Sequence, residues 1–220
     1  MQRGHNRQTV FADDIDRKAY LDMLRDAAAY CGVAIHAYAL LEADVHLLAT
    51  PGGAASLARL MQSLGRRYVA AFNRRHGRSG TLWEGRFRAS VIDAASLGQL
   101  AVVHVETAPI RAGLATAAGD WPWSSAGHHL GRWRDPLVTE HPAYWALGNT
   151  PFEREYAHAH ILEEGVSPAH TDHFDRAVMS GRVAGSADFA IGIQKRTGVP
   201  QQSRPRGRPA GAIRSTRKED

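Results

Sequence analysis

The chain has 220 residues, a net charge of +5 and a single cysteine, Cys31. One cysteine excludes an internal disulfide framework and a cysteine-rich zinc site. No apolar run reaches the roughly 18 residues of a membrane span, and the first residues lack the apolar core of a signal peptide. We therefore expect a cytoplasmic protein with one sizeable domain and an additional segment.

The first half of the chain begins with a helix followed by two strands. Apolar residues recur at helical spacing over residues 14–31, and Gly32 ends the run. Residues 33–41 and 45–50 alternate in polarity as half-buried strands do. Only three residues separate these two runs, so we predict an antiparallel hairpin.

Helical spacing returns over residues 54–75, and residues 85–93 read as a further strand. Residues 95–107 are predicted as a helix that ends before Pro109. If a strand precedes the first helix, this order is the βαββαβ plan of a ferredoxin-like α+β sandwich. The candidate for that first strand, QRGHNRQTVF, is very short, so the strand is either clipped or begins upstream.

Three regions are expected along the chain. Residues 1–148 are predicted to form the main domain and residues 149–199 a helical C-terminal extension, with short helices near 152–165 and 170–180. Residues 200–220 are rich in Pro, Gly, Ser and Arg, which is typical of a disordered basic tail.

Basic residues are concentrated in two stretches of a chain that is otherwise close to neutral. Residues 64–90 contain seven arginines and one acidic residue, and residues 195–220 contain eight basic and two acidic residues. Such concentrations indicate a polyanionic partner. Ordinary solvated surface is the alternative interpretation.

One strand carries two potential metal ligands. Asp44 and His46 flank Val45 in a run that is otherwise apolar. Residues two apart in a strand project from the same face, so these side chains are expected to lie side by side. The spacing raises the question whether they form a working metal site.

Several motifs make the chain similar to a known family. They are, in order, QRGHNRQTVF, AIHAYALLEADVHLLATP, LARLMQSLGRRYVAAFNRRHGRSGTLWEGRFRASVID, HVETAPIRAGL and WPWSSAGHH. Over roughly residues 2–148 the chain resembles the REP-associated tyrosine transposases of the HUH superfamily, relatives of the single-tyrosine transposases of small insertion sequences.

The resemblance implies a ferredoxin-like fold that binds single-stranded or hairpin DNA at short palindromic repeats, as a monomer or homodimer. It also implies a divalent metal, usually magnesium, held by a His-hydrophobe-His pair. A tyrosine on a later helix attacks the scissile phosphate and forms a covalent link to DNA. In general terms, the metal offsets the charge on the phosphate and the tyrosine oxygen supplies the covalent intermediate.

The chain departs from this pattern at three of the four key positions. Asp44 stands where the family has its first histidine, whereas His46 keeps the second. His104 occupies the position of the nucleophilic tyrosine, and Ala108 the polar position one helical turn later. Magnesium accepts a carboxylate ligand, so the first change is tolerable. Alanine cannot ligate a metal, and a phosphohistidine link to DNA is foreign to the family.

We therefore predict that strand cleavage of the family type is lost while DNA binding persists. A second hypothesis is an active metal-dependent enzyme with a rearranged site of Asp44, His46 and His104. Glu106 is in the wrong register for that cluster, because residues two apart do not share a helix face. A third hypothesis is a domesticated DNA-binding regulator without catalysis.

DNA binding is expected to depend on many arginines rather than on one oxygen. The resemblance implies that the N-terminal segment lies close to bound DNA. The arginines of the second predicted helix are placed to line a phosphate channel, and Arg86 and Arg88 share one face of the predicted strand. The predicted DNA-binding residues are Gln2, Arg3, Asn6, Arg7, Arg66, Arg67, Arg74, Arg75, Arg86 and Arg88. Trp83 has two interpretations, core packing or stacking on an unpaired base.

The tail adds a separate signal. Arg206 and Arg208, in the stretch PRGRP, resemble the core of an AT-hook, which lays two arginines along the minor groove of A·T-rich DNA. The remaining histidines have no convincing metal-binding spacing and are predicted to be surface residues. They are His128, His129, His158, His160, His170 and His173.

Overall fold

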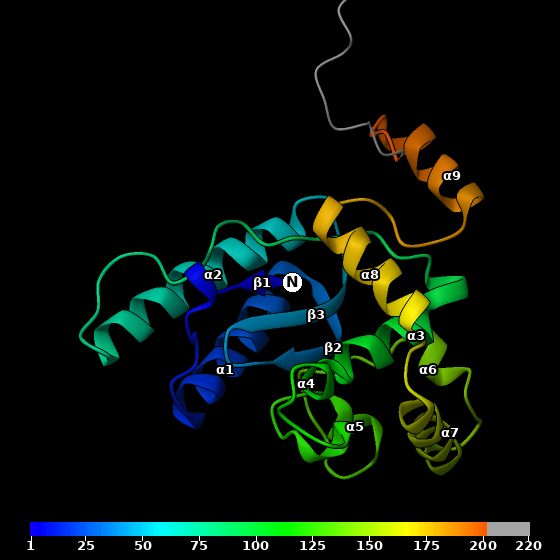
Figure 1. Cartoon of the computed structure of the whole chain (residues 1–220), viewed down its shortest axis with the longest axis horizontal. Coiled ribbons are helices and arrows are strands. Elements are labelled where there is room, and N and C mark those ends of the chain that lie inside the picture. The colour runs from blue at the N-terminus through cyan, green and yellow to red at the C-terminus, as the bar shows by residue number, and fades with distance from the viewer. Residues whose placement is uncertain (202–220) are drawn as a thin grey trace, which may run out of the picture.

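The computed structural model of the chain describes residues 1–201 (Figure 1). Within this range the elements, in chain order, are β1 (Gln2–Arg3), η1 (His5–Arg7), α1 (Asp14–Cys31), β2 (Val33–Leu40), β3 (Asp44–Pro51), α2 (Ser56–Arg75), α3 (Ala94–Glu106), α4 (Ala108–Arg111), η2 (Ala118–Asp120), α5 (Ala126–His129), α6 (Pro142–Trp145), α7 (Pro151–Glu164), α8 (Pro168–Ser180) and α9 (Ala187–Thr197). The predicted α+β class is confirmed. No helix in this part of the chain is long and apolar enough to cross a membrane.

The strands form an antiparallel sheet in the order β1-β3-β2. The predicted hairpin of β2 and β3 is confirmed, and its register places His46 opposite Ala39. β1 has two residues, which pair with β3 as Gln2 with Val45 and Arg3 with Asp44. The expected short first strand is therefore present, and β3 is the central strand.

The strand predicted over residues 85–93 is wrong. Part of this segment runs along β1, where the amide of Glu84 donates to the Arg3 carbonyl at 2.9 Å and the amide of Arg88 donates to the Met1 carbonyl at 2.8 Å. Three residues separate Glu84 from Arg88, whereas one separates Arg3 from Met1, so the segment bulges and no regular ladder forms. The bulge leaves isolated hydrogen bonds in place of a strand ladder.

One face of the sheet packs against α1 and α2. The core between them contains Tyr20, Leu24, Leu60 and Tyr68, with residues of both long strands. The Asp13 carboxylate caps α1 by accepting from the amide of Asp16, and α1 ends at Gly32, whose φ of 63° is left-handed, as the sequence predicted.

Trp83 belongs to the same core. Its side chain is buried, and its ring lies 6.4 Å from that of Tyr20 and 6.2 Å from that of Tyr68. Of the two interpretations of Trp83, core packing is therefore the one that the structure supports.

The other face of the sheet is covered by α3. Val102 and Val105 pack against Ala37 and Ala39 of β2, whose small side chains allow the helix to approach the sheet closely. α3 is itself covered from outside, because Ala101 packs against Phe174 of α8 in a second cluster. α3 is thus the middle layer between the sheet and the C-terminal helices (Figure 1).

The C-terminal helices follow the sequence prediction in part. α7 and α8 correspond to the helices expected near 152–165 and 170–180, whereas α9 was not predicted. α7 begins with a capping box formed by Thr150 and Glu153. The tail residues Arg206 and Arg208 lie outside the described residues.

Candidate functional site

Asp44 and His46 lie on the face of β3 that is turned toward α3. Their neighbours Val45 and Leu47 pack in the core under α1 and α2, so the residues alternating with them face the other way. The pKa of His46 is lowered to about 3, mainly by burial and further by the positive charges of the Met1 amine and Arg111. The imidazole is therefore neutral at physiological pH. Burial also lowers the pKa of the Met1 amine, to about 6.

The carboxylate of Asp44 is already engaged. Its Oδ1 accepts from Nε of Arg3 at 2.7 Å, and both side chains are about three-quarters buried, with 23% and 27% of their surface exposed. The register of β1 and β3 places the two residues directly opposite each other. Arg3 thus engages one of the two carboxylate oxygens of Asp44.

His104 lies near the end of α3 and is buried against α8. Its Nε2 is 3.4 Å from Oδ1 of Asp175, and its ring centroid is 4.9 Å from that of Phe174. The Arg111 guanidinium donates to the His104 carbonyl at 2.8 Å. Burial, and then the charge of Arg111, lowers the pKa of His104 to about 3.

These three side chains do not form a close ligand group. His104 is near enough to His46 for its charge to lower the pKa of His46. Within residues 1–201, however, the group of three ligating side chains whose ligand atoms all lie within 4.8 Å of one another is a different one, Glu106, His129 and His158. Ala108 is buried in the core against the sheet and offers no ligand.

The predicted DNA-binding arginines of α2 fall into two groups. Arg67 forms an ion pair with Asp26 at 3.3 Å, and Arg75 donates to both Asp13 and Asp16 of α1 at 2.6 Å. Arg66 and Arg74 are exposed and have no ion pair in the described part of the chain. The first group holds α2 to α1, and the second faces solvent.

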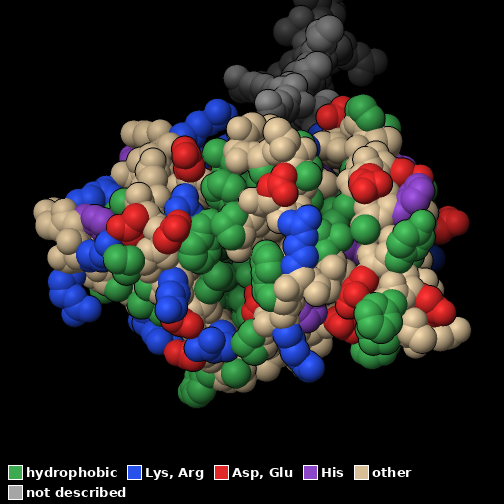
Figure 2. Space-filling model, turned by 90° about the horizontal axis from the view of Figure 1, so that it is seen from below, with side chains coloured by type: hydrophobic (Ala, Val, Ile, Leu, Met, Phe, Trp, Pro, Cys, Tyr) green, Lys and Arg blue, Asp and Glu red, His purple; other side chains and the backbone are tan. Residues whose placement is uncertain are grey.

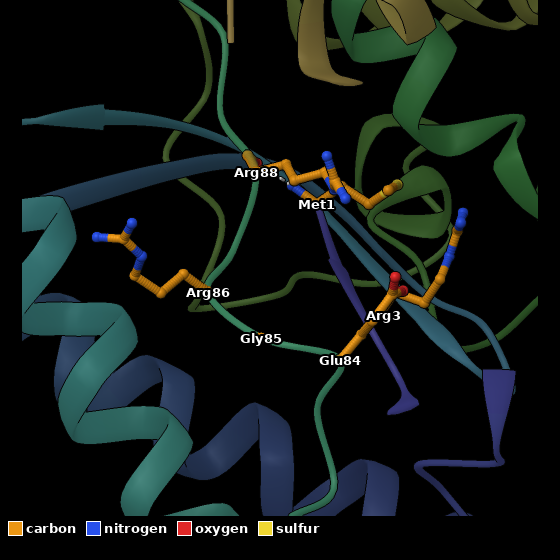
Figure 3. Close-up of a pocket in the computed structure, with 6 residues that line it drawn as sticks. All are labelled: Met1, Arg3, Glu84, Gly85, Arg86 and Arg88. Atoms are coloured by element: carbon orange, nitrogen blue, oxygen red, sulfur yellow. Dashed lines mark hydrogen bonds between the residues drawn. The ribbon is translucent and has the colours of Figure 1, made fainter. Parts of the chain in front are cut away.

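A small pocket lies beside β1. It has a volume of about 220 Å³ and is lined by Met1, Arg3, Glu84, Gly85, Arg86 and Arg88. Figure 3 shows that the side chains of Arg3 and Arg86 point in opposite directions, whereas that of Arg88 extends beside Met1. The arginines therefore form a basic strip along the edge of the sheet rather than a cradle for one anion.

The N-terminal segment borders this strip. Gln2 is buried, whereas Asn6 and Arg7 are exposed and adopt left-handed φ angles of 52° and 56°. Such angles are uncommon outside glycine, and here the loop is fixed by Gln8, whose Nε2 donates to the Leu82 carbonyl at 2.9 Å. In Figure 2, Lys and Arg side chains gather over the side of the molecule that holds α1 and α2.

The prediction that the remaining histidines are surface residues is wrong for two of them. His129 and His158 are fully buried, and each contacts the fully buried carboxylate of Glu106. His128 is largely buried as well, with 11% of its side chain exposed, whereas His160 is exposed. The sequence offers little signal for this cluster, because its members are separated by 23 and 52 residues from Glu106.

Comparisons with known proteins place this geometry in context. Neither the curated proteins nor the solved structures gave a match to the chain. Residues 1–102, which contain the sheet, α1, α2 and the first part of α3, match the family model described as "Transposase IS200 like".

Proposed function

We propose that the protein binds single-stranded or hairpin DNA of the REP repeat type and that its catalytic centre no longer cleaves DNA. The family match supports a transposase-related function in DNA binding. The observation that supports the loss of cleavage is the set of groups around His46: Arg3 pairs with Asp44, and the positive charge of Arg111 lowers the pKa of His46.

The donor set does not fit a magnesium ion. Magnesium prefers oxygen ligands in near-octahedral geometry, whereas here the one carboxylate is paired with Arg3 and the other two candidates are imidazoles. Cationic neighbours add electrostatic repulsion to any divalent ion.

The position of the nucleophile is also inaccessible. His104 has 9% of its side chain exposed and is covered by Phe174 and Asp175 of α8. A nucleophile must approach the scissile phosphate in line, which needs an open path to the reacting atom. The tyrosine oxygen is absent, and α8 covers the position of the nucleophile. Both changes disfavour cleavage of DNA.

DNA binding rests on the exposed arginines. Arg7, Arg66, Arg74, Arg86 and Arg88 are exposed and occupy the N-terminal segment, α2 and the edge of the sheet. Phosphate contacts of this kind supply affinity that falls with salt. The cell's use of such a protein as a regulator, without catalysis, is compatible with this proposal.

Electrophoretic mobility shifts test the binding. A labelled hairpin with a single-stranded flank is expected to bind more tightly than a duplex of the same composition, and binding should weaken steeply with salt. The variant Arg86→Ala/Arg88→Ala should weaken it, whereas the control Arg25→Ala, in an exposed pair with Asp22 on α1, should not. Equal binding to an unrelated acidic polymer would contradict the proposal.

Cleavage assays test the catalytic centre. With magnesium or manganese, the unmodified protein should neither cut the flanked hairpin nor become covalently attached to it. The triple variant Asp44→His/His104→Tyr/Ala108→Asn restores the family pattern, and any gain of cleavage would show that only the chemistry has decayed. Cleavage by the unmodified protein that His104→Ala abolishes would instead favour the rearranged enzyme, for which the proximity of His104 to His46 is the supporting observation.

A further inference from the structure

Three helices bring a carboxylate and two imidazoles together in the interior. Glu106 at the end of α3, His129 of α5 and His158 of α7 are all fully buried. Glu106 Oε1 lies 2.6 Å from His129 Nδ1, and Glu106 Oε2 lies 2.8 Å from His158 Nε2. The Ser125 hydroxyl donates to the same Oε1 at 2.5 Å.

The carboxylate carries a charge that needs compensation. Burial alone would raise the pKa of Glu106, but the charges and hydrogen bonds of the two histidines outweigh burial and hold this pKa below its ordinary value. The ion-pair partners of Glu106 in the described part of the chain are these two imidazoles. An ionised carboxylate away from water is costly unless a positive charge lies beside it.

Each imidazole has a second nitrogen that does not face Glu106. His158 Nδ1 lies 2.8 Å from Nε2 of Gln99. His129 Nε2 has no hydrogen-bond partner among the described residues.

Gln99 can also support the tautomer that a metal requires. If its amide is turned over, Oε1, which has no partner in the present orientation, accepts from N–H at His158 Nδ1. His158 Nε2 is then unprotonated and its lone pair faces Glu106. A hydrogen bond to the outer nitrogen is the usual means of orienting a metal-bound histidine.

We propose that Glu106, His129 and His158 bind a transition-metal ion of the zinc class, with the Ser125 hydroxyl beside the carboxylate. Two imidazoles and a carboxylate are a donor set that suits zinc and its neighbours rather than magnesium. Their ligand atoms all lie within 4.8 Å of one another. Ligands of tetrahedral zinc stand about 3.3 Å apart, given metal–ligand distances of about 2.0 Å, so the hydrogen-bonded pairs open by about half an ångström.

This site is separate from the DNA surface and from the Asp44–His46 pair. It lies where α3 meets α5 and α7, so the metal stabilises the attachment of the C-terminal helices to the middle layer. Metal binding to residues from separate helices contributes directly to folding. The site is structural, since its three protein side chains are closed off from solvent.

Metal content of the full-length protein is the first test. The protein, expressed with zinc in the medium and purified without chelator, should contain one zinc ion per chain by mass spectrometry. His129→Gln and His158→Gln should each lose it. His160→Gln, an exposed histidine of the same helix paired with Glu164, should keep it, as should Asp44→Ala.

A spectroscopic measurement on the unmodified protein tests the site even if the histidine variants fail to fold. X-ray absorption at the zinc edge should show imidazole scattering from two histidines and no sulfur. Folded protein that contains no metal, or metal that persists in both histidine variants, overturns the proposal. Loss of metal in Asp44→Ala alone would move the ion to the other site and overturn it as well.

Discussion

Arg3 and Asp44 form an ion pair at 2.7 Å between directly opposed residues of β1 and β3. The pair joins a strand of only two residues to the centre of the sheet. It also changes the chemistry of β3, because a carboxylate held by a guanidinium is a poor ligand for a cation. One contact thus joins the edge of the fold to its centre and engages one carboxylate oxygen of the candidate metal site.

A double-mutant cycle measures this pair. Arg3→Ala and Asp44→Ala should each lower the free energy of unfolding, and the double variant should lose less than the sum. The coupling energy should be about 1 kcal/mol, the upper range for ion pairs that keep some solvent contact. Urea denaturation of the four proteins checks this. Additive losses would show that the pair contributes no stability.

The buried His104 should make stability depend on pH. Its pKa is about 3 in the folded protein, because of burial and Arg111, against 6.5 for a free histidine. Below pH 6.5 the unfolded chain therefore binds a proton that the folded protein does not, and stability falls as the pH is lowered toward 3. The loss is at most about 1.4 kcal/mol per pH unit.

The matched comparison is His104→Gln against His160→Gln. Denaturation at pH 7, 6 and 5 should show a smaller decrease for His104→Gln than for the unmodified protein, and an unchanged decrease for the exposed His160→Gln. An identical pH dependence of all three proteins would mean that His104 protonates normally in the fold.

Arg86 and Arg88 should account for part of the salt dependence of DNA binding. Each phosphate contact that is lost should reduce the slope of log K against log salt by about 0.7–0.9, the lower value applying to single strands. The Arg67→Ala variant is a useful comparison, because its guanidinium pairs with Asp26 and should change the slope little. If the slope is unchanged in Arg86→Ala/Arg88→Ala, the DNA does not contact these two arginines.

Trp83 should matter for stability and not for DNA contact. Its ring is buried against Tyr20 and Tyr68, so Trp83→Ala should lower the free energy of unfolding by about 3–5 kcal/mol. Trp83→Phe keeps an aromatic ring in the core and should leave the hairpin affinity close to that of the unmodified protein. A large loss of hairpin affinity in a Trp83→Phe variant that folds stably would instead indicate that Trp83 stacks on a DNA base.

The elements that the sequence predicted best are those with a local signal. α1 has apolar residues at helical spacing and Gly32 at its end, and both signals are visible in the sequence. The hairpin of β2 and β3 follows from alternation and a short connection. These signals depend on neighbours along the chain, so no tertiary information is needed.

The predictions that failed concern partners far apart in the sequence. Residues 85–93 are predicted as a strand, but the segment bulges between Glu84 and Arg88 where it passes β1, so no regular ladder forms. His129 and His158 look polar and exposed in sequence, yet Glu106 supplies hydrogen bonds that make their burial possible. Strand pairing and side-chain burial depend on contacts between segments that are far apart in the sequence.

The position of α3 between the sheet and the C-terminal helices sets the size of the cooperative folding unit. The segment that matches the transposase family ends at residue 102, inside α3. Val103 packs against Leu162 of α7, and Ala101 packs against Phe174 of α8. A chain cut at residue 102 would lack Val103 and would expose the surface of Ala101 that α8 covers, so we expect the unit that folds cooperatively to extend at least through α8, well beyond the unit of sequence similarity.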